Sequence, residues 1–284
     1  MRLPALSAMR NPLGQFLRAR RHLTTPDRVG LTRVGDHRRT PGLRREEVAM
    51  LAGVSIDYYT RLEQGRQRHP SDQVLSALAR VLQLDSEATE HLHHLAHPLT
   101  RKRRSIRGVE QVDSTTLRLM DSWDHAPARV VNHRLDVLAQ NPLNVALYEG
   151  LGYSDNLIRL TFLDPAAREF YPDWEQEARD KVAHLHAALA AYRDDPALPE
   201  LVEELSLASE DFRQKWARYD VGCWACGHRT RRFHHRAVGA MTLRFQAFAV
   251  NHVAGQQLIV SQAEPGSPSE NAVVKLAALN VSHR

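Results

Sequence analysis

The chain has 284 residues, of which 43% are hydrophobic, and carries a formal charge of +5 at pH 7. This length allows one or two domains, and the hydrophobic fraction is sufficient for folded cores. Two cysteines are too few for a secreted disulfide scaffold, and the sequence has neither a signal-peptide core nor a run of about 18 apolar residues. We therefore expect a cytoplasmic protein without a membrane segment.

The charges are distributed unevenly along the chain. Basic residues crowd residues 10–68 and 101–107, whereas residues 164–211 are locally acidic. A basic half and an acidic half predict a DNA-binding module joined to a domain that does not touch DNA. The predicted boundaries are a helical DNA-binding domain over 10–97, a basic linker over 98–109 and a second domain over 110–284.

Residues 11–23 predict the first helix, because their apolar side chains recur at helical spacing. Asn11 can cap this helix, and Pro12 occupies the first helical position, where its missing N–H costs nothing. Residues 24–42 are rich in proline and glycine and predict a long loop. Its arginines are either phosphate contacts or solvated side chains, and both interpretations stay open: Arg33, Arg38 and Arg39.

The pattern over residues 41–66 indicates two short helices joined by a tight corner. The first helix carries an apolar stripe at helical spacing, formed by Val48, Ala49, Leu51 and Ala52. Gly53 is suited to end it, because glycine has no Cβ that would clash at positive φ. Ser55 can cap the second helix, whose Tyr59 and Leu62 point to the core.

The outer face of this second helix is predicted to contact DNA. In a helix-turn-helix, the N-terminal residues of the second helix reach base edges in the major groove. Arg61 is suited to guanine, Ile56 to a thymine methyl, and Asp57 either to cytosine or to a local cap. An ordinary helical hairpin is the alternative, but the corner glycine, the cap and the basic flanks favour the helix-turn-helix.

Further residues are predicted to contact the DNA backbone. Tyr58 is a candidate phosphate contact, as are Arg44 and Arg45 at the start of the preceding helix. Glu63 is expected to pair with a nearby arginine instead. The complete predicted DNA-binding set is Arg44, Arg45, Ser55, Ile56, Asp57, Tyr58, Arg61, Arg66 and Arg68.

Residues 38–49, 52–55 and 58–66 resemble the MmyB-like (MltR-type) transcription regulators, whose DNA-binding domain is a helix-turn-helix of the Xre family. The resemblance implies five helices around one small core. Two of these are predicted after residue 70: a helix capped by Ser71, and a helix over 86–96. One small helix reads few bases, so we expect a homodimer on a two-fold operator in double-stranded DNA.

The fifth helix also contains histidines. His93 and His97 have the i, i+4 spacing of metal ligands on a helix. No cysteine or carboxylate joins them in the sequence, so a solvated or packing face is the favoured interpretation.

The second domain is predicted to be α+β, which makes the fold class an α domain followed by an α+β domain. Short strands are expected at 128–133, 135–139, 230–236, 238–250 and 256–262. Helices are expected at 113–123, at about 155–161, and at 165–170, 173–192, 198–207 and 209–218. A further helix is expected to begin at Asn141-Pro142. The last helix is expected at 270–279, with Ser269 as its cap.

Six segments of this domain look like the ligand-binding domain of the same family: 131–141, 162–168, 171–174, 204–206, 232–235 and 263–269. The resemblance implies a PAS-like fold with an apolar cavity, and a family member is known to hold a long-chain fatty acid there. No cofactor is expected beyond such a fatty acid as effector.

Aromatic residues are the candidates for the wall of this apolar ligand site. Plain core packing is the alternative for each of them. Arg159, Arg232 or His235 is the candidate anchor for a carboxylate. The predicted ligand-binding set is Phe162, Phe170, Tyr171, Trp174, Phe212, Trp216, Phe233 and His235.

Cys223 and Cys226 form a Cys-x-x-Cys pair, which departs from what the resembled family implies. With neighbouring histidines the pair is compatible with a zinc or redox site, so a metal or thiol sensor is the alternative function. A single pair is weak evidence, and incidental cysteines are the favoured interpretation.

A nucleophile elbow, a phosphate loop and a dinucleotide fingerprint are all absent from the sequence, so we do not expect an enzyme.

Overall fold

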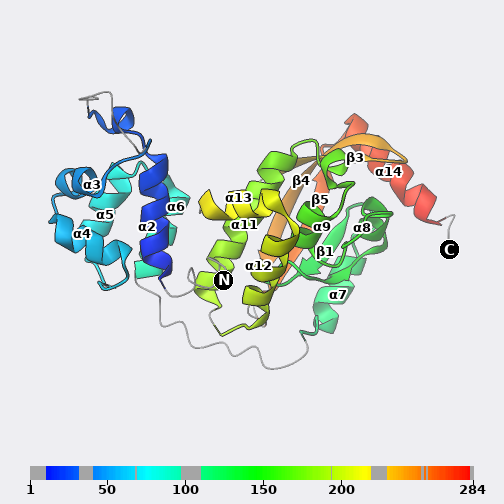
Figure 1. Cartoon of the computed structure of the whole chain (residues 1–284). Coiled ribbons are helices and arrows are strands. Elements are labelled where there is room, and N and C mark those ends of the chain that lie inside the picture. Colours follow the sequence, from blue (N-terminus) through cyan, green and yellow to red (C-terminus); the bar gives the residue numbers. More distant parts are fainter. Residues whose placement is uncertain are drawn as a thin grey trace. The chain divides into compact units, whose positions relative to one another are not determined.

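The computed structural model describes residues 11–31, 41–67, 69–96, 110–192, 194–218, 229–250, 253 and 255–281. Contacts divide the chain into two compact units. Figure 1 labels the helices and strands of both. The first unit combines residues 1–103 with 182–223, and the second combines residues 104–181 with 224–284. Helix α11 (Trp174–Ala191) therefore contributes residues to both units.

The N-terminal part of the first unit is helical, as predicted. Its elements are α2 (Pro12–Leu23), the 3-10 turn η1 (Pro26–Val29), α3 (Arg45–Ala52), α4 (Ile56–Glu63), α5 (Asp72–Val81) and α6 (Ser86–Ala96). The turn η1 corrects the expectation of an irregular loop from residue 24, because Pro26 fixes a backbone angle that suits a helical turn. Arg33, Arg38 and Arg39 lie outside the described residues.

Local chemistry sets the ends of these helices. Asn11 Oδ1 accepts a hydrogen bond from the Gly14 N–H at 3.0 Å. Ser55 Oγ accepts from the Tyr58 N–H at 3.1 Å, which caps α4. Gly53 has φ 68°, so the predicted glycine corner between α3 and α4 is confirmed. The buried core of these helices includes Phe16, Leu17, Val48, Tyr59, Leu62, Leu75, Leu78 and Leu92.

A buried carboxylate joins three of these helices. Glu63 at the end of α4 accepts from Arg21 Nε of α2 at 2.6 Å and from Arg45 Nε of α3 at 2.7 Å. The Glu63 side chain is 1% exposed. Burial raises the pKa of Glu63, but hydrogen bonds and charges of the two arginines outweigh it and leave the pKa below its usual value. The predicted pairing of Glu63 with arginine is confirmed.

The remaining helices of the first unit are α12 (Ala197–Ala208) and α13 (Glu210–Arg218). Leu198, Leu201 and Leu205 form the buried face of α12. Ser209 Oγ accepts a hydrogen bond from the Phe212 N–H at 3.2 Å and so caps α13.

The second unit contains a five-stranded antiparallel sheet in the order β2-β1-β5-β4-β3. The strands confirm the predicted positions: β1 (Ala128–Val131), β2 (Val137–Gln140), β3 (Arg229–His235), β4 (Gly239–Ala249) and β5 (Gln257–Ala263). The helices of this unit, besides part of α11, are α7 (Ser114–Asp121), α8 (Pro142–Leu147), α9 (Leu157–Leu163), α10 (Ala167–Phe170) and α14 (Pro268–Val281).

The start of α14 differs from the prediction. The helix begins at Pro268, and Ser267 Oγ accepts from the Glu270 N–H at 3.2 Å. Ser269 lies inside the helix, and its Oγ accepts from the Thr242 N–H of β4 at 2.9 Å. The predicted cap at Ser269 is wrong because Pro268 favours the first helical position, which makes the preceding serine the cap.

The two faces of the sheet bury different side chains. Antiparallel pairing places opposed residues on the same face. Ala128, Val130, Leu258 and Val260 share one face and pack with Met120 of α7. Arg129 opposes Ile259, and Arg231 opposes Leu243, so these residues lie on the other face with Phe233 and Phe245.

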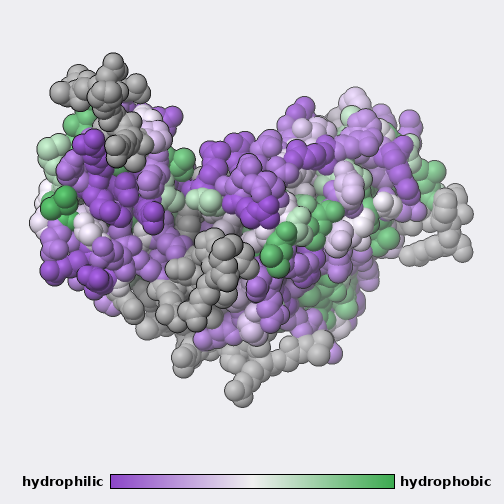
Figure 2. All heavy atoms as spheres, viewed as in Figure 1, coloured by the Kyte–Doolittle hydropathy of each residue, from purple (hydrophilic) through white to green (hydrophobic). Residues whose placement is uncertain are grey.

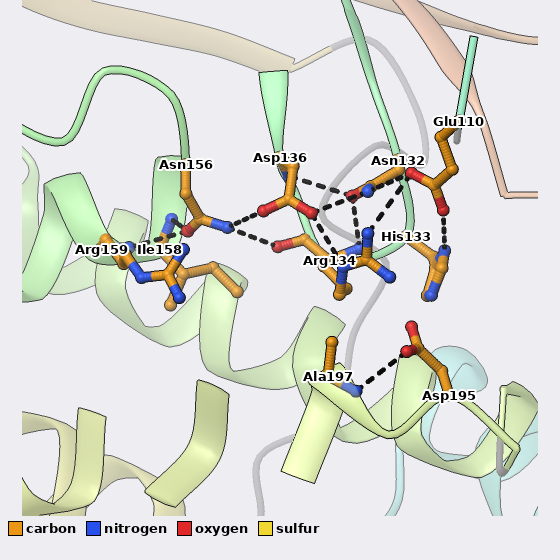
Figure 3. A network of polar contacts seen from close by, with 10 residues as sticks. All are labelled: Glu110, Asn132, His133, Arg134, Asp136, Asn156, Ile158, Arg159, Asp195 and Ala197. Carbon is orange, nitrogen blue, oxygen red and sulfur yellow. Dashed lines mark hydrogen bonds and ion pairs between the residues drawn. The ribbon is translucent and has the colours of Figure 1, made fainter. Parts of the chain in front are cut away.

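A polar network holds the β1–β2 turn (Figure 3). Asn132 Nδ2 and Arg134 Nε both donate to Asp136 Oδ2 at 2.8 Å, and Asn156 Nδ2 donates to Asp136 Oδ1 at 2.7 Å. Asn132 also donates to Glu110. Burial raises the pKa of Asp136, but the hydrogen bonds and the charge of Arg134 outweigh it and lower the pKa.

Within the described residues, no helix combines the length and the apolar character needed to cross a membrane. Hydrophilic residues cover most of the face shown in Figure 2, and apolar residues form separate patches on it.

We expect Glu63→Gln to destabilise the protein by about 3–5 kcal/mol, because it leaves Arg21 buried without a countercharge. Glu46→Ala is the matched control, since Glu46 is exposed and its pair with Arg44 spans 3.4 Å. The control is expected to cost less than about 1 kcal/mol. Urea unfolding followed by far-ultraviolet circular dichroism measures both changes, and equal midpoints for the two variants would contradict the prediction.

Asp136 is expected to make stability depend on pH. Its pKa is lowered on folding, so its contribution is present above the ordinary value of about 3.9 and is lost as the pH falls through the folded pKa. Asp136→Asn should remove this part of the acid sensitivity, whereas Asp155→Asn at an exposed neighbour should keep it. Unfolding free energies measured between about pH 5 and pH 2 test this, and parallel wild-type and Asp136→Asn curves would contradict it.

Candidate functional site

The exposed face of α4 is the first candidate site. Ile56 is 52% exposed, and Asp57 and Arg61 are exposed beside it. Arg61 Nη2 pairs with Asp57 Oδ2 at 2.8 Å, one helical turn away. Tyr58 is half-buried against the helical core, and burial raises its pKa, which keeps the phenol neutral. The face therefore presents one apolar side chain beside an accessible ion pair.

Arginines at the start of α3 flank this face. Arg44 donates its backbone N–H to Glu47 Oε2 at 2.6 Å, and its exposed side chain pairs with Glu46 at 3.4 Å. Arg45 is tied to Glu63 while its side chain remains 44% exposed. Arg66 is exposed after α4, and Arg68 lies outside the described residues. Ser55, a predicted DNA contact, already uses its hydroxyl as the cap of α4.

The predicted ligand-binding aromatics form three separate groups. In the second unit, Phe170 packs against Tyr171 and Phe233, with ring centroids 4.8 and 5.4 Å apart. Phe162 packs against Trp174 at 5.9 Å, and Arg168 lies over the Trp174 ring at 3.7 Å.

The third aromatic group belongs to the first unit. Trp216 stacks on Phe212 and on His186, with ring centroids 5.5 and 3.7 Å apart. Burial, the largest cause, lowers the pKa of His186 to about 3, so its ring is neutral. His186 is a stacking partner that the sequence pattern did not indicate.

Tyr148 was missing from the predicted set. It caps α8 at its C-terminal end and lies 5.2 Å from Phe170 and 6.5 Å from Phe233 between ring centroids. Tyr171 donates its hydroxyl to the Tyr148 hydroxyl at 3.4 Å. Local sequence gave no reason to select Tyr148, because these partners come from α10 and β3.

The predicted anchors have other partners. His235 Nε2 donates to the Ala146 carbonyl at 3.1 Å, and His235 Nδ1 accepts from the Ala237 N–H at 3.2 Å. Burial lowers the His235 pKa, so the ring is neutral. Arg232 is exposed, and its Nε donates to Asp173 Oδ2 at 2.6 Å. Arg159 lies half-buried on α9.

A group of buried charges lies in the second unit and was not predicted. Glu177 of α11 accepts from Lys181 Nζ at 2.7 Å and pairs with Arg231 Nε at 2.9 Å. Burial raises the Glu177 pKa, but these cations outweigh it and lower the pKa. Burial is also the largest influence on Lys181 and lowers its pKa to about 8. Arg129 of β1 lies over the Tyr148 ring, with its Cζ 4.7 Å from the centroid.

The Cys223–Cys226 pair lies outside the described residues. Across the described ranges, no group of three or more histidine, cysteine, aspartate or glutamate side chains is arranged to hold a metal ion.

Both parts of the chain match models of known protein families. Residues 12–92 match a helix-turn-helix domain model, and residues 112–277 match the MmyB-like transcription regulator ligand binding domain. The chain belongs to the MmyB-like transcription regulators. A search of curated proteins finds no match. The helical part of this MmyB-like regulator is thus a DNA-binding module, and its α+β part is a ligand-binding domain.

Proposed function

We propose that the MmyB-like regulator reads its operator with the exposed face of α4. The observation that carries this proposal is the presence of Ile56 and Arg61 at the surface of a capped second helix. Arg61 is suited to guanine O6 and N7, and Ile56 is suited to a thymine methyl. Asp57 holds Arg61 through an ion pair that DNA has to compete with, so it contributes to selectivity.

The surrounding residues are proposed to fix the helix on the DNA backbone. Arg44, Arg45, Arg66 and Arg68 supply positive charge for phosphates, with Tyr58 as a further contact. Ser55 acts by capping α4. A homodimer on a two-fold operator is part of this proposal, because one short helix specifies few base pairs. The protein acts in the cytoplasm and through binding, without catalysis.

The effector is proposed to be a fatty acid or a similar lipid. Support comes from the aromatic group Tyr148, Phe170, Tyr171 and Phe233, whose buried rings pack together inside a ligand-binding domain. A ligand that prefers one conformation of this domain shifts the equilibrium between conformations and so changes operator binding. A PAS-like fold of the ligand-binding domain is also part of this proposal.

Arg61→Ala is expected to weaken operator binding by about 1–3 kcal/mol and to broaden base preference at one position, because a bidentate base contact is lost. Binding sites selected from a random duplex pool provide the operator, and titrations with single-base variants measure the preference. Arg118→Ala removes another exposed arginine, from α7, and should leave both properties unchanged. An equal loss on every sequence would instead place Arg61 on the phosphates.

The lipid effector is tested by extracting the purified, denatured protein with organic solvent and identifying the extract by mass spectrometry. We expect one fatty acid or similar lipid in stoichiometric amount, since a buried aromatic surface retains apolar molecules during purification. The extract of host cells that lack the protein is the control. A purified protein without bound lipid, which also binds none on titration, contradicts the lipid proposal.

A further inference from the structure

Helix α14 carries apolar side chains on two opposite sides. One side holds Ala272, Val273 and Leu276, which are buried where the helix packs against β4, β5 and α8. The other side exposes Val274 and Ala278, and Val274 is 64% exposed. A surface helix of a globular domain ordinarily places polar residues opposite its buried stripe. The outer side of α14 therefore has the composition of a contact surface.

The outer side chains of α14 have the spacing of a seam between two helices. Asn271, Val274 and Ala278 are three and four residues apart, which is the heptad spacing that aligns side chains along one side of a helix. All three are exposed, and Lys275 is the one charged residue between Asn271 and Ala278. We call Asn271, Val274 and Ala278 the α14 seam. Leu276 lies on the opposite, buried side, so the seam points away from the sheet.

Further exposed apolar side chains lie on α14 and on the helix beside it. Leu279 of α14 is 42% exposed, and α8, which packs against α14, adds Val145 at 47%. In the described helix-turn-helix part, the large exposed apolar residues are Leu23, Met50 and Ile56, which lie on three different helices. Ile56 is already proposed to contact DNA. The pair α8 and α14 therefore offers the more continuous apolar contact surface.

A second copy of the chain fits the α14 seam. Two copies on a two-fold operator meet through the same surface patch, so this patch has to match itself. When two α14 helices pack antiparallel with the two-fold axis level with Leu276, Val274 of each copy lies opposite Ala278 of the other. Both layers then combine one larger and one smaller side chain and have equal thickness. A parallel pair would oppose valine to valine and alanine to alanine, which gives layers of unequal thickness.

We propose that two copies of this regulator dimerise through α14, with their seams packed antiparallel. This inference rests on the proposed homodimer and names its contact surface. The 14 residues of α14 offer a strip about 21 Å long and about 10 Å wide, which is smaller than the about 800 Å² per copy of a standard interface. The dimer is therefore weak in the absence of DNA. The two half-sites of an operator strengthen it by holding both copies together.

Sedimentation equilibrium of the full chain tests the pairing without DNA. We expect wild-type protein to dimerise with a Kd of about 10–100 µM. Val274→Glu and Ala278→Lys should each weaken dimerisation at least about tenfold, because each places a charge in an apolar layer. An equal mixture of the two variants should recover to within about threefold of wild type, because the new glutamate of one copy faces the new lysine of the other.

The matched control is Leu207→Glu, which places the same charge on α12 at a leucine that is 63% exposed. It should dimerise as wild type. Glutamate and lysine are good helix formers at exposed positions, so all variants should keep the wild-type circular dichroism spectrum.

Operator duplexes separate dimerisation from damage to the DNA-binding helices. The operator comes from selection in a random duplex pool, and a second duplex carries one half-site alone. Val274→Glu should weaken binding to the complete operator and leave binding to the single half-site unchanged, because only the complete operator brings two copies together. An equal loss on both duplexes would overturn the assignment of Val274 to dimerisation.

The outcomes distinguish this inference from the homodimer proposal. Wild-type dimerisation that neither substitution weakens overturns the α14 seam and leaves a homodimer formed elsewhere, with a different protein as the occupant of α14. Weakening by both substitutions without recovery in the mixture overturns the antiparallel pairing. Wild-type protein that stays monomeric at about 200 µM and binds two half-sites without cooperativity overturns both the seam and the homodimer.

Discussion

The placement of α4 in the helix-turn-helix domain depends on one buried carboxylate. Glu63 ends α4 and binds Arg21 of α2 and Arg45 of α3, so three helices meet at a single charged group. Its geometry is specific, because each carboxylate oxygen faces a guanidinium and the Glu63 side chain is only 1% exposed. Packing of Tyr59 and Leu62 fixes which side of α4 is buried, and the ion pairs fix its orientation against its neighbours. Ile56 and Arg61 reach the surface as a consequence.

The ligand-binding domain places charges inside its fold in a different way. Glu177, Lys181 and Arg231 form a buried group whose members come from α11 and β3, and Arg129 joins it from β1. Replacing such a group with apolar residues is often neutral or stabilising, so buried ions are weak evidence for stability. Buried aromatic rings pack together beside Arg129 in the same region.

The two domains thus use arginine for opposite purposes. On α4 and α3, arginines remain accessible although they are paired with Asp57 and Glu63, so the proposed DNA contacts have to compete with these ion pairs. In the ligand-binding domain, Arg129 is removed from water and lies over the Tyr148 ring. Salt is therefore expected to affect the first kind of contact more strongly than the second.

Sequence by itself determined the local elements and the class of protein. Asn11, Ser55 and Gly53 set helix ends through bonds and backbone angles within a few residues, and alternation in β4 set a half-buried strand. Only the tertiary structure decided which distant side chains meet. Phe212 and Trp216 form one aromatic group, and Phe170 and Phe233 belong to another. His235 forms hydrogen bonds with two backbone groups, and the Arg129 guanidinium lies over the Tyr148 ring. Strand register and helix packing set these contacts, and neither is encoded in the spacing of neighbouring residues.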